Sequence, residues 1–294
     1  MPIVEANFSE DLREQFISEL TKLGAALPVG KTDVRSAGVA YFNVLRRLIP
    51  RRPRTVHKSK ELQEHALTQE QGTRLEAIVN EIEAGSDLTQ RLSKSVFDRP
   101  LYNDGQQNDW DVRHLHVGPI ENAHGAELLF VSVTDDAMYL VEWGEHGVQS
   151  FANQRMLEIL HTNWPEVVAH FRAPGVEPGS LDPADLTPEE RDRLRRRFTI
   201  CTQVSDGTIY LPAAGGVVGD GTATDIVIAV NRHRELAHEV EQWARSKAGE
   251  IRDGIVRATG NRLATLKFRY SFDPSRQDVQ IRELQSGFTI RPTR

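Results

Sequence analysis

The apolar residues change their period in the middle of the chain, and this change most constrains the fold. Residues 112–118, 128–133 and 138–143 do not follow the helical spacing of apolar residues, and we interpret them as strands of alternating side-chain direction. Alternation is typical of β-strands, because successive side chains on a strand point to opposite faces. Thr134-Asp135-Asp136 predicts a tight turn between the last two strands. We therefore predict a three-stranded antiparallel β-meander.

The flanking segments have mostly helical spacing. On the N-terminal side, apolar residues three or four apart predict helices over 9–23, 33–49 and 68–84, and another helix follows the meander over 151–161. The C-terminal part predicts two hairpins, over 198–211 and 263–284, and a long helix within 224–247. The predicted class is α+β: N-terminal helices with a central antiparallel β-meander, then a smaller α+β domain.

The chain has 294 residues, which suits two domains of roughly 100–200 residues each. A stretch rich in proline, glycine and acidic residues, 173–187, is typical of a linker, and a short charged helix follows it. The predicted division is residues 1–174 for the helices and the meander, 175–197 for the linker and charged helix, and 198–294 for the C-terminal domain.

Composition restricts the classes of function. The single cysteine, Cys201, excludes an intramolecular disulfide framework and a multi-cysteine zinc site. Residues 1–14 lack the apolar core of a signal peptide, and no apolar run approaches the ~18 residues of a membrane span. We expect a cytoplasmic protein with no membrane partner and no cofactor. The net charge of -6 means that a polyanion would have to bind a local basic patch.

The first strand of the predicted meander carries a pair of histidines. His114 and His116 are two residues apart, so they share one face of the strand, while Leu115 and Val117 share the other and are expected to face the core. Histidine is the side chain whose ordinary pKa lies near neutrality. Two imidazoles on an open sheet face would therefore suit proton transfer.

The third strand of the predicted meander leads to another histidine, His146, within Gly144-Glu145-His146-Gly147. A meander brings the end of its third strand near the first, so His146 can join the pair. Arg113 and Glu142 lie close in sequence. Cleavage of a phosphodiester needs a base for the attacking hydroxyl, an acid for the leaving oxygen and a cation for the charge on phosphorus. These side chains supply all three.

Two other interpretations of the histidines stay open. One or both of His114 and His116 can be structural, each bound only by hydrogen bonds. Alternatively, His114, His116 and His146 can be three ligands of a metal ion, as in catalytic zinc sites that keep one open position. No carboxylate stands at a recognised metalloenzyme spacing from them.

The segment 46–60 is basic and contains no acidic residue, which stands out in a chain of negative net charge. Its prolines hold part of it extended, and such a patch suits a phosphate backbone. A solvated loop or a protein-facing or membrane-facing arm is the alternative. The candidate nucleic-acid-binding residues are Arg46, Arg47, Arg51, Arg52, Arg54, Lys58 and Lys60.

The block from Asp109 to Pro165, with its Asp-Trp-x3-His-x-His-x-Gly beginning, resembles a block found in uncharacterised bacterial proteins. The layout of the same segment is similar to the β-meander core of RelE-like mRNA-interferase toxins, whose third strand ends in Gly-His-Arg. Here Gly144-Glu145-His146 stands at that place and the arginine is missing. The resemblance implies a toxin-like fold core that acts on RNA.

Together these features lead to three hypotheses. The first is a metal-independent endoribonuclease or related phosphodiesterase, as a toxin or phage-defence effector with a possible protein partner such as an antitoxin. His114 and His116 then perform acid–base catalysis, His146 assists, Arg113 or the basic run holds phosphate, and RNA is favoured over DNA. The second is a non-enzymatic nucleic-acid-binding or regulatory module. The third is a histidine-ligated metalloenzyme.

Overall fold

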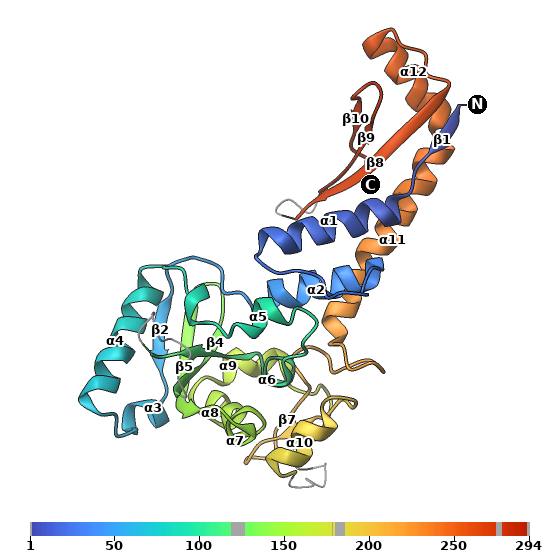
Figure 1. The fold of residues 1–294 in the computed structure, drawn as a ribbon. Helices are drawn as coiled ribbons and strands as arrows, with labels where there is room; N and C mark the ends of the chain where they lie inside the picture. The colour runs from blue at the N-terminus through green and yellow to red at the C-terminus, as the bar shows by residue number, and fades with distance from the viewer. Residues whose placement is uncertain (1, 119–126, 178, 180–185, 275–277, 293–294) are drawn as a thin grey trace. The chain divides into compact units, whose positions relative to one another are not determined.

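A computed structural model describes the chain except for residues 1, 119–126, 178, 180–185, 275–277 and 293–294. The chain folds into two compact units, and the predicted α+β class is confirmed. Unit 1 comprises Met1–Phe42 and Ile228–Arg294, and unit 2 comprises Asn43–Val227. The boundaries between the units fall within helices α2 (Val34–Arg47) and α11 (Thr224–Ser246), both labelled in Figure 1.

Unit 1 is a sheet packed against helices. Its strands have the order β1-β8-β9-β10, with β1 parallel to β8 and the other pairs antiparallel. The predicted last hairpin is therefore confirmed. The elements within this unit are β1 (Ile3–Glu5), α1 (Phe8–Lys22), α12 (Ala248–Thr259), β8 (Thr265–Asp273), β9 (Asp278–Glu283) and β10 (Thr289–Ile290).

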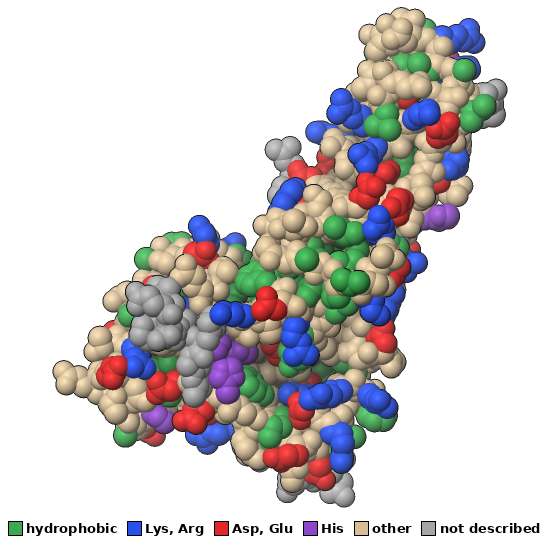
Figure 2. All heavy atoms as spheres, viewed as in Figure 1, with side chains coloured by type: hydrophobic (Ala, Val, Ile, Leu, Met, Phe, Trp, Pro, Cys, Tyr) green, Lys and Arg blue, Asp and Glu red, His purple; other side chains and the backbone are tan. Residues whose placement is uncertain are grey.

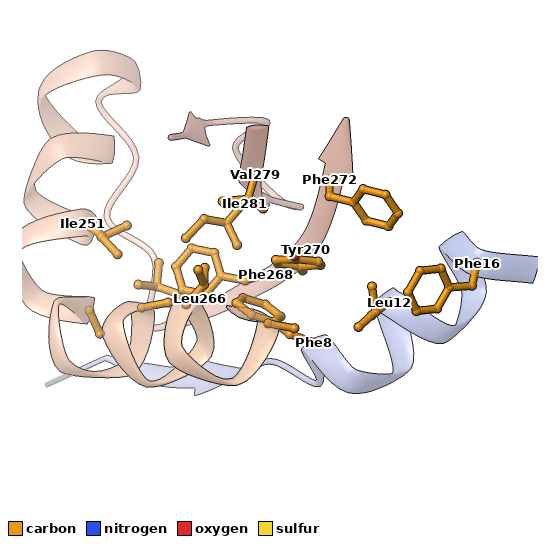
Figure 3. Close-up of a cluster of buried hydrophobic side chains, with 14 of the residues drawn as sticks. Phe8, Leu12, Phe16, Ile251, Leu266, Phe268, Tyr270, Phe272, Val279 and Ile281 are labelled. Atoms are coloured by element: carbon orange, nitrogen blue, oxygen red, sulfur yellow. The ribbon is translucent and has the colours of Figure 1, made fainter. Parts of the chain in front are cut away.

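The core of unit 1 explains why the two ends of the chain fold together. Phe8, Leu12 and Phe16 form the apolar stripe of α1, and all three are fully buried against a row of aromatic residues on β8 (Figure 3). That row includes Phe268 and Tyr270, which alternate with polar residues on the other face of the strand. A stripe of this kind must be buried against another element to stabilise the fold.

Unit 2 contains the predicted meander. Strands β3 (Val112–His116), β4 (Glu127–Val133) and β5 (Ala137–Glu145) pair antiparallel in the expected order, which confirms the meander. A fourth strand, β2 (Thr55–Lys58), pairs parallel with β5 and was not predicted. The order is β2-β5-β4-β3, so β2 and β3 lie at opposite edges of the sheet.

Short helices surround this sheet. The remaining elements of unit 2 are α3 (Lys60–Glu64), α4 (Gln69–Glu83), η1 (Thr89–Arg91), α5 (Ser95–Asp98), α6 (Gly105–Trp110), α7 (Val148–Phe151), α8 (Arg155–Asn163), α9 (Pro165–Val168), η3 (Ala169–Phe171), α10 (Pro188–Leu194), β6 (Thr202–Gln203) and β7 (Ile209–Tyr210). Leu128 and Phe130 of the sheet pack against Leu160 of α8. Leu115 and Leu129, on the opposite face, are also fully buried. Both faces of the sheet are therefore covered.

The two units differ from the expected division at residues 174 and 198. Residues 1–42 fold with the C-terminal strands, and the hairpin β6–β7 belongs to unit 2. Long-range packing causes the difference, because α1 is buried against β8 and β7 bridges to Arg172. Spacing within a segment predicts an apolar stripe but not the element that covers it.

Candidate functional site

The three histidines of the meander converge in unit 2. The ring centroids of His114 and His116 are 6.0 Å apart, and those of His146 lie 6.1 Å from His114 and 5.2 Å from His116. His114 pairs with Phe130 and His116 with Leu128 on β4, so the predicted common face is confirmed. His146 follows the end of β5. Figure 2 shows histidine side chains gathered at the surface of this unit, with lysine or arginine side chains on the same face.

The expectation of an open sheet face was wrong. His116 is only 3% exposed, and His114 lies 5.1 Å from the ring of Phe151, measured between centroids. The histidines share their face with Phe130, which is fully buried, because α8 and the segment before it cover this face. His146, just beyond the strand, is exposed. The imidazoles therefore run from a buried position to the surface.

A cavity of about 390 Å³ opens beside His114 and His146, and we call it the histidine cavity. His116 is not among the described residues that line it. The charged residues among the described lining are five arginines and two aspartates, so the cavity favours an anion. They are Arg47, Arg99, Arg113, Arg195, Arg196, Asp104 and Asp192.

The two imidazoles at the histidine cavity both favour the neutral state. Burial lowers the pKa of His114 below its ordinary value; nearby Asp104 raises it in part, and His146 lowers it further. Burial also lowers the pKa of His146. Because each imidazolium would repel the other, the pair favours at most one proton at neutral pH.

Helix α6 and the turn after it position one wall of the cavity. Asp104 caps α6 by accepting a hydrogen bond from the backbone N–H of Gln107 at 3.1 Å. Asp111 then adopts a left-handed conformation with φ of 50°, which aspartate tolerates better than most residues. This turn leads α6 directly into β3, so Asp104 and His114 come to the same cavity although a helix separates them in sequence.

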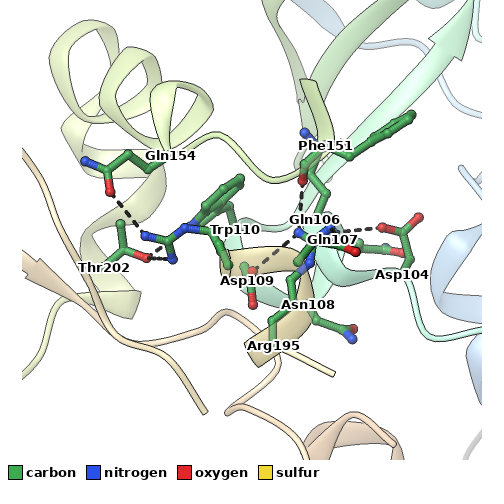
Figure 4. Close-up of polar contacts among 12 residues, drawn as sticks. Asp104, Gln106, Gln107, Asn108, Asp109, Trp110, Phe151, Gln154, Arg195 and Thr202 are labelled. Carbon is green, nitrogen blue, oxygen red and sulfur yellow. Dashed lines mark hydrogen bonds and ion pairs between the residues drawn. The ribbon is translucent and has the colours of Figure 1, made fainter. Parts of the chain in front are cut away.

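Arg195 forms the part of the wall that comes from the end of α10. Its guanidinium donates to the main-chain oxygen of Phe151 at 2.9 Å and pairs with Asp109 at 3.5 Å (Figure 4). It also pairs with Asp192 at 2.8 Å. The backbone of Gly105 lies against this guanidinium. Burial raises the pKa of Asp109 to about 6, and Arg195 lowers it in part. Arg195 is thus a buried cation held from three sides.

A second arginine of α10 fastens this helix to the rest of unit 2. The guanidinium of Arg191 donates to Thr202 at 3.1 Å and to Gln154 at 3.2 Å. It also lies over the ring of Trp110, 5.6 Å from the centroid. Burial lowers the pKa of Arg191, and nearby Asp109 raises it in part. These contacts keep Arg195 in place at the cavity.

Arg113 and Glu142, both predicted site residues, have different positions. Arg113 lines the histidine cavity, where it donates to the main-chain oxygen of Arg46 at 3.2 Å and lies 3.4 Å from Asp111. Glu142 pairs with Arg155 at 2.8 Å and is not among the described lining residues. The structure therefore brings Arg113 to the histidines but gives Glu142 another partner.

Most members of the basic run have partners within unit 2, and its role in phosphate binding stays a prediction. Arg47 and Arg54 are buried, and both donate to main-chain carbonyl oxygens. Four other cations of the run form ion pairs with acidic residues that are distant in sequence. The lack of acidic residues within the run itself therefore does not predict these pairs. These pairs are Arg46 with Asp225, Arg51 with Asp87, Arg52 with Asp135, and Lys58 with Glu76.

The run also lies away from the histidines for the most part. Arg47 is the member of the run among the described lining residues of the cavity. The later members lie on β2 or beside it, at the edge of the sheet opposite β3. Lys60 begins α3 and is exposed. The seven cations therefore do not form one surface with the histidines.

Sequence reasoning missed Arg99, Tyr102, Asp104, Arg195 and Arg196, which line the histidine cavity. A signal was present for the last two, because the segment 191–197 is rich in arginine, but we interpreted it as a short charged helix after a linker and not as part of a site. Within the described part of the chain, no group of three or more His, Cys, Asp or Glu side chains has an arrangement that holds a metal ion.

Comparison of the chain with protein-family models, with curated proteins and with solved structures finds no match. Nor does any helix among the described residues combine the length and apolar character that crossing a membrane requires.

Proposed function

We propose that the histidine cavity is the active site of a metal-independent phosphodiesterase that cleaves RNA. One observation carries this proposal: the imidazoles of His114 and His146, 6.1 Å apart, face a cavity whose described charged lining is mainly arginine. Acid–base catalysis needs two such groups on either side of the reacting phosphate, and the transition state needs nearby cations.

In this mechanism His114 is the general base. Its lowered pKa keeps it neutral at pH 7, so it can accept the proton of the ribose 2′-hydroxyl. The 2′-oxygen forms a bond to the adjacent phosphorus while the bond from phosphorus to the 5′-oxygen breaks. His146 donates a proton to that leaving oxygen. The products are a 2′,3′-cyclic phosphate and a free 5′-hydroxyl.

His146 reaches its acidic form when the substrate binds. It is exposed, and its pKa is lowered in the free protein by partial burial. A bound phosphate places negative charge near the ring, and opposite charge favours the imidazolium form. The negative charge of the bound phosphate thus favours protonation of His146, the proposed acid catalyst.

The arginines divide into two groups. Arg47 and Arg195 are buried and held by carbonyl or carboxylate oxygens, so they contribute a fixed positive field. Arg196 is 72% exposed, which leaves it accessible to a phosphate even though it pairs with Asp192. We assign Arg196 and the exposed Arg99 as direct phosphate contacts.

The test is cleavage of an end-labelled single-stranded RNA by purified protein in EDTA. Wild type should yield a 2′,3′-cyclic phosphate end, and His114→Gln and His146→Gln should each lower kcat by at least about a hundredfold, as loss of acid–base catalysis does. His57→Gln is the matched control, since His57 is exposed on β2 at the opposite edge of the sheet. RNA left intact by wild type in EDTA would refute the proposal.

The arginine-rich lining also favours a second candidate, a non-enzymatic nucleotide-binding module. In that case wild type binds RNA without cleaving it, and His114→Gln leaves binding unchanged. The histidine-ligated metalloenzyme predicts a third pattern: EDTA abolishes activity and zinc restores it. The same purified protein distinguishes the three.

We further propose a cytoplasmic toxin or phage-defence role, because the RNA that such an enzyme would cleave is in the cytoplasm. Induced expression in bacteria should then arrest growth, and His114→Gln should relieve the arrest at equal protein level. Equal arrest by wild type and variant would contradict a role that depends on catalysis.

A further inference from the structure

Tyr102 presents a large aromatic ring inside a charged cavity. It lines the histidine cavity and is 42% exposed. Its backbone is fixed, because its N–H donates to the oxygen of Arg99 at 2.9 Å and its own oxygen accepts from Asn43 Nδ2 at 2.5 Å. Asn43 also binds the oxygen of Pro100, at 2.9 Å. The ring is therefore displayed by a well-anchored turn.

Charged groups lie around this ring. The guanidinium of Arg99 lies over the ring, 4.9 Å from the centroid. Burial raises the pKa of the Tyr102 hydroxyl, and the charged groups that act on it include Asp104, Asp192 and Arg196. These three charged groups line the histidine cavity together with Tyr102, and Arg196 is the assigned phosphate contact.

We infer that Tyr102 is a stacking platform for an unpaired base, and that the histidine cavity therefore takes single-stranded RNA. An exposed aromatic ring adds nothing to the binding of a phosphate alone, whereas every base has a face that stacks on such a ring. A paired base is already stacked within its helix and cannot reach the ring. This role of Tyr102 rests on the proposed function, which places the phosphate of the substrate in the cavity.

The binding test compares two ligands that share sugar and phosphate. Adenosine 5′-monophosphate carries a base, and ribose 5-phosphate does not. Calorimetric titration of wild type should give a Kd for the nucleotide roughly ten- to a hundredfold below that for ribose 5-phosphate, the range that aromatic stacking supplies. Tyr102→Leu should remove this difference while leaving the Kd of ribose 5-phosphate unchanged. Tyr102→Phe should keep it.

Phe198→Leu is the matched control. Phe198 is also an exposed aromatic residue of unit 2, at 60% exposure, and it is not among the described residues lining the histidine cavity. The control should bind both ligands as wild type does. Because the side chains of Tyr102 and Phe198 are both partly exposed, both variants should fold, which circular dichroism checks.

A wild-type protein with equal affinity for the two ligands, or with measurable affinity for neither, overturns the inference. So does a Tyr102→Leu variant that keeps the wild-type difference. RNA cleavage is measured separately: cleavage in EDTA without base-dependent binding leaves the proposed function standing and removes the stacking role. Base-dependent binding without cleavage removes the phosphodiesterase and keeps the platform.

Discussion

Asp109 and Arg195 form a buried ion pair of 3.5 Å that joins α6 to the end of α10. Their side chains are only 8% and 7% exposed. Arg195 favours the charged carboxylate, but burial opposes it more strongly, so the pKa of Asp109 rises from 3.8 to about 6. The charged form of Asp109 is thus less favourable in the folded protein than in the unfolded chain, although Arg195 offsets part of the desolvation cost.

Asp109→Asn should gain stability relative to wild type as the pH rises. A carboxyl whose folded pKa is raised binds more protons in the folded state, so its contribution to stability falls as pH rises from about 4 to about 6. The difference between a pKa of 3.8 and one of about 6 corresponds to roughly 3 kcal/mol. The difference in melting temperature between variant and wild type, measured from pH 4 to 7.5, should grow with pH.

Asp206→Asn provides a control of opposite sign. Hydrogen bonds from Thr208 lower the pKa of Asp206, so this carboxylate stabilises the fold above its ordinary pKa and the contribution is lost as pH falls. This variant should be less stable than wild type at pH 7.5 and should approach it in acid. A constant difference for Asp109→Asn across the pH range would contradict the burial argument.

The pH profile of activity should be bell-shaped with its optimum on the acidic side of 6.5. His114 must be neutral to act as a base, and its lowered pKa places the acidic limb below 6.5. His146 must be protonated to act as an acid, and its lowered pKa brings the basic limb down as well. The profile of kcat/KM for a dinucleotide measures both in the free protein.

The two limbs can be assigned separately. In the residual activity of His114→Gln the acidic limb should be lost, whereas in His146→Gln the basic limb should be lost. An unchanged profile in either variant would remove that histidine from catalysis.

Arg196→Ala should raise KM by about tenfold and weaken its dependence on salt, because one phosphate contact is lost. Arg51→Ala is the matched control, since the two arginines are 72% and 69% exposed and each pairs with one aspartate. Arg51 belongs to the basic run and is not among the described residues lining the cavity. Equal effects of the two substitutions would favour the basic run as the phosphate-binding surface.

The meander was predictable because strand alternation is a local property. His114 and His116 share a face as a direct consequence of their spacing, and the short turn before β5 fixes which strands pair. The convergence with His146 follows from the same topology. These parts of the site require no knowledge of distant contacts.

The rest of the site depends on packing that no local pattern encodes. Arg195 reaches the cavity because Arg191 and Asp109 hold α10 against α6, and the sequence places these residues in a charged helix after a linker. Arg54 belongs to the basic run, whose composition predicts phosphate contacts, but its side chain is buried among carbonyl oxygens. Charge alone does not distinguish a ligand-binding arginine from a structural one.

Gly105→Ala should disturb the cavity through Arg195, which supplies the three atoms nearest to a Cβ at this position. A Cβ at this position would lie 2.5 Å from Arg195 Cζ, closer than atoms can approach. The guanidinium cannot move freely, because Phe151, Asp192 and Asp109 hold it. We expect a loss of about 1–3 kcal/mol in unfolding free energy, as overpacking of a buried site produces, with a fall in kcat/KM from the displaced cation.

Gly72→Ala separates this steric effect from helix propensity. Gly72 lies in α4, where an added Cβ meets nothing within 4 Å, so alanine should stabilise the helix by about 0.5–1 kcal/mol. Chemical denaturation measures both variants, and the RNA cleavage assay measures kcat/KM. If Gly105→Ala stabilised the protein as Gly72→Ala should, Arg195 would be free to move and would not be the fixed cation that the proposed mechanism requires.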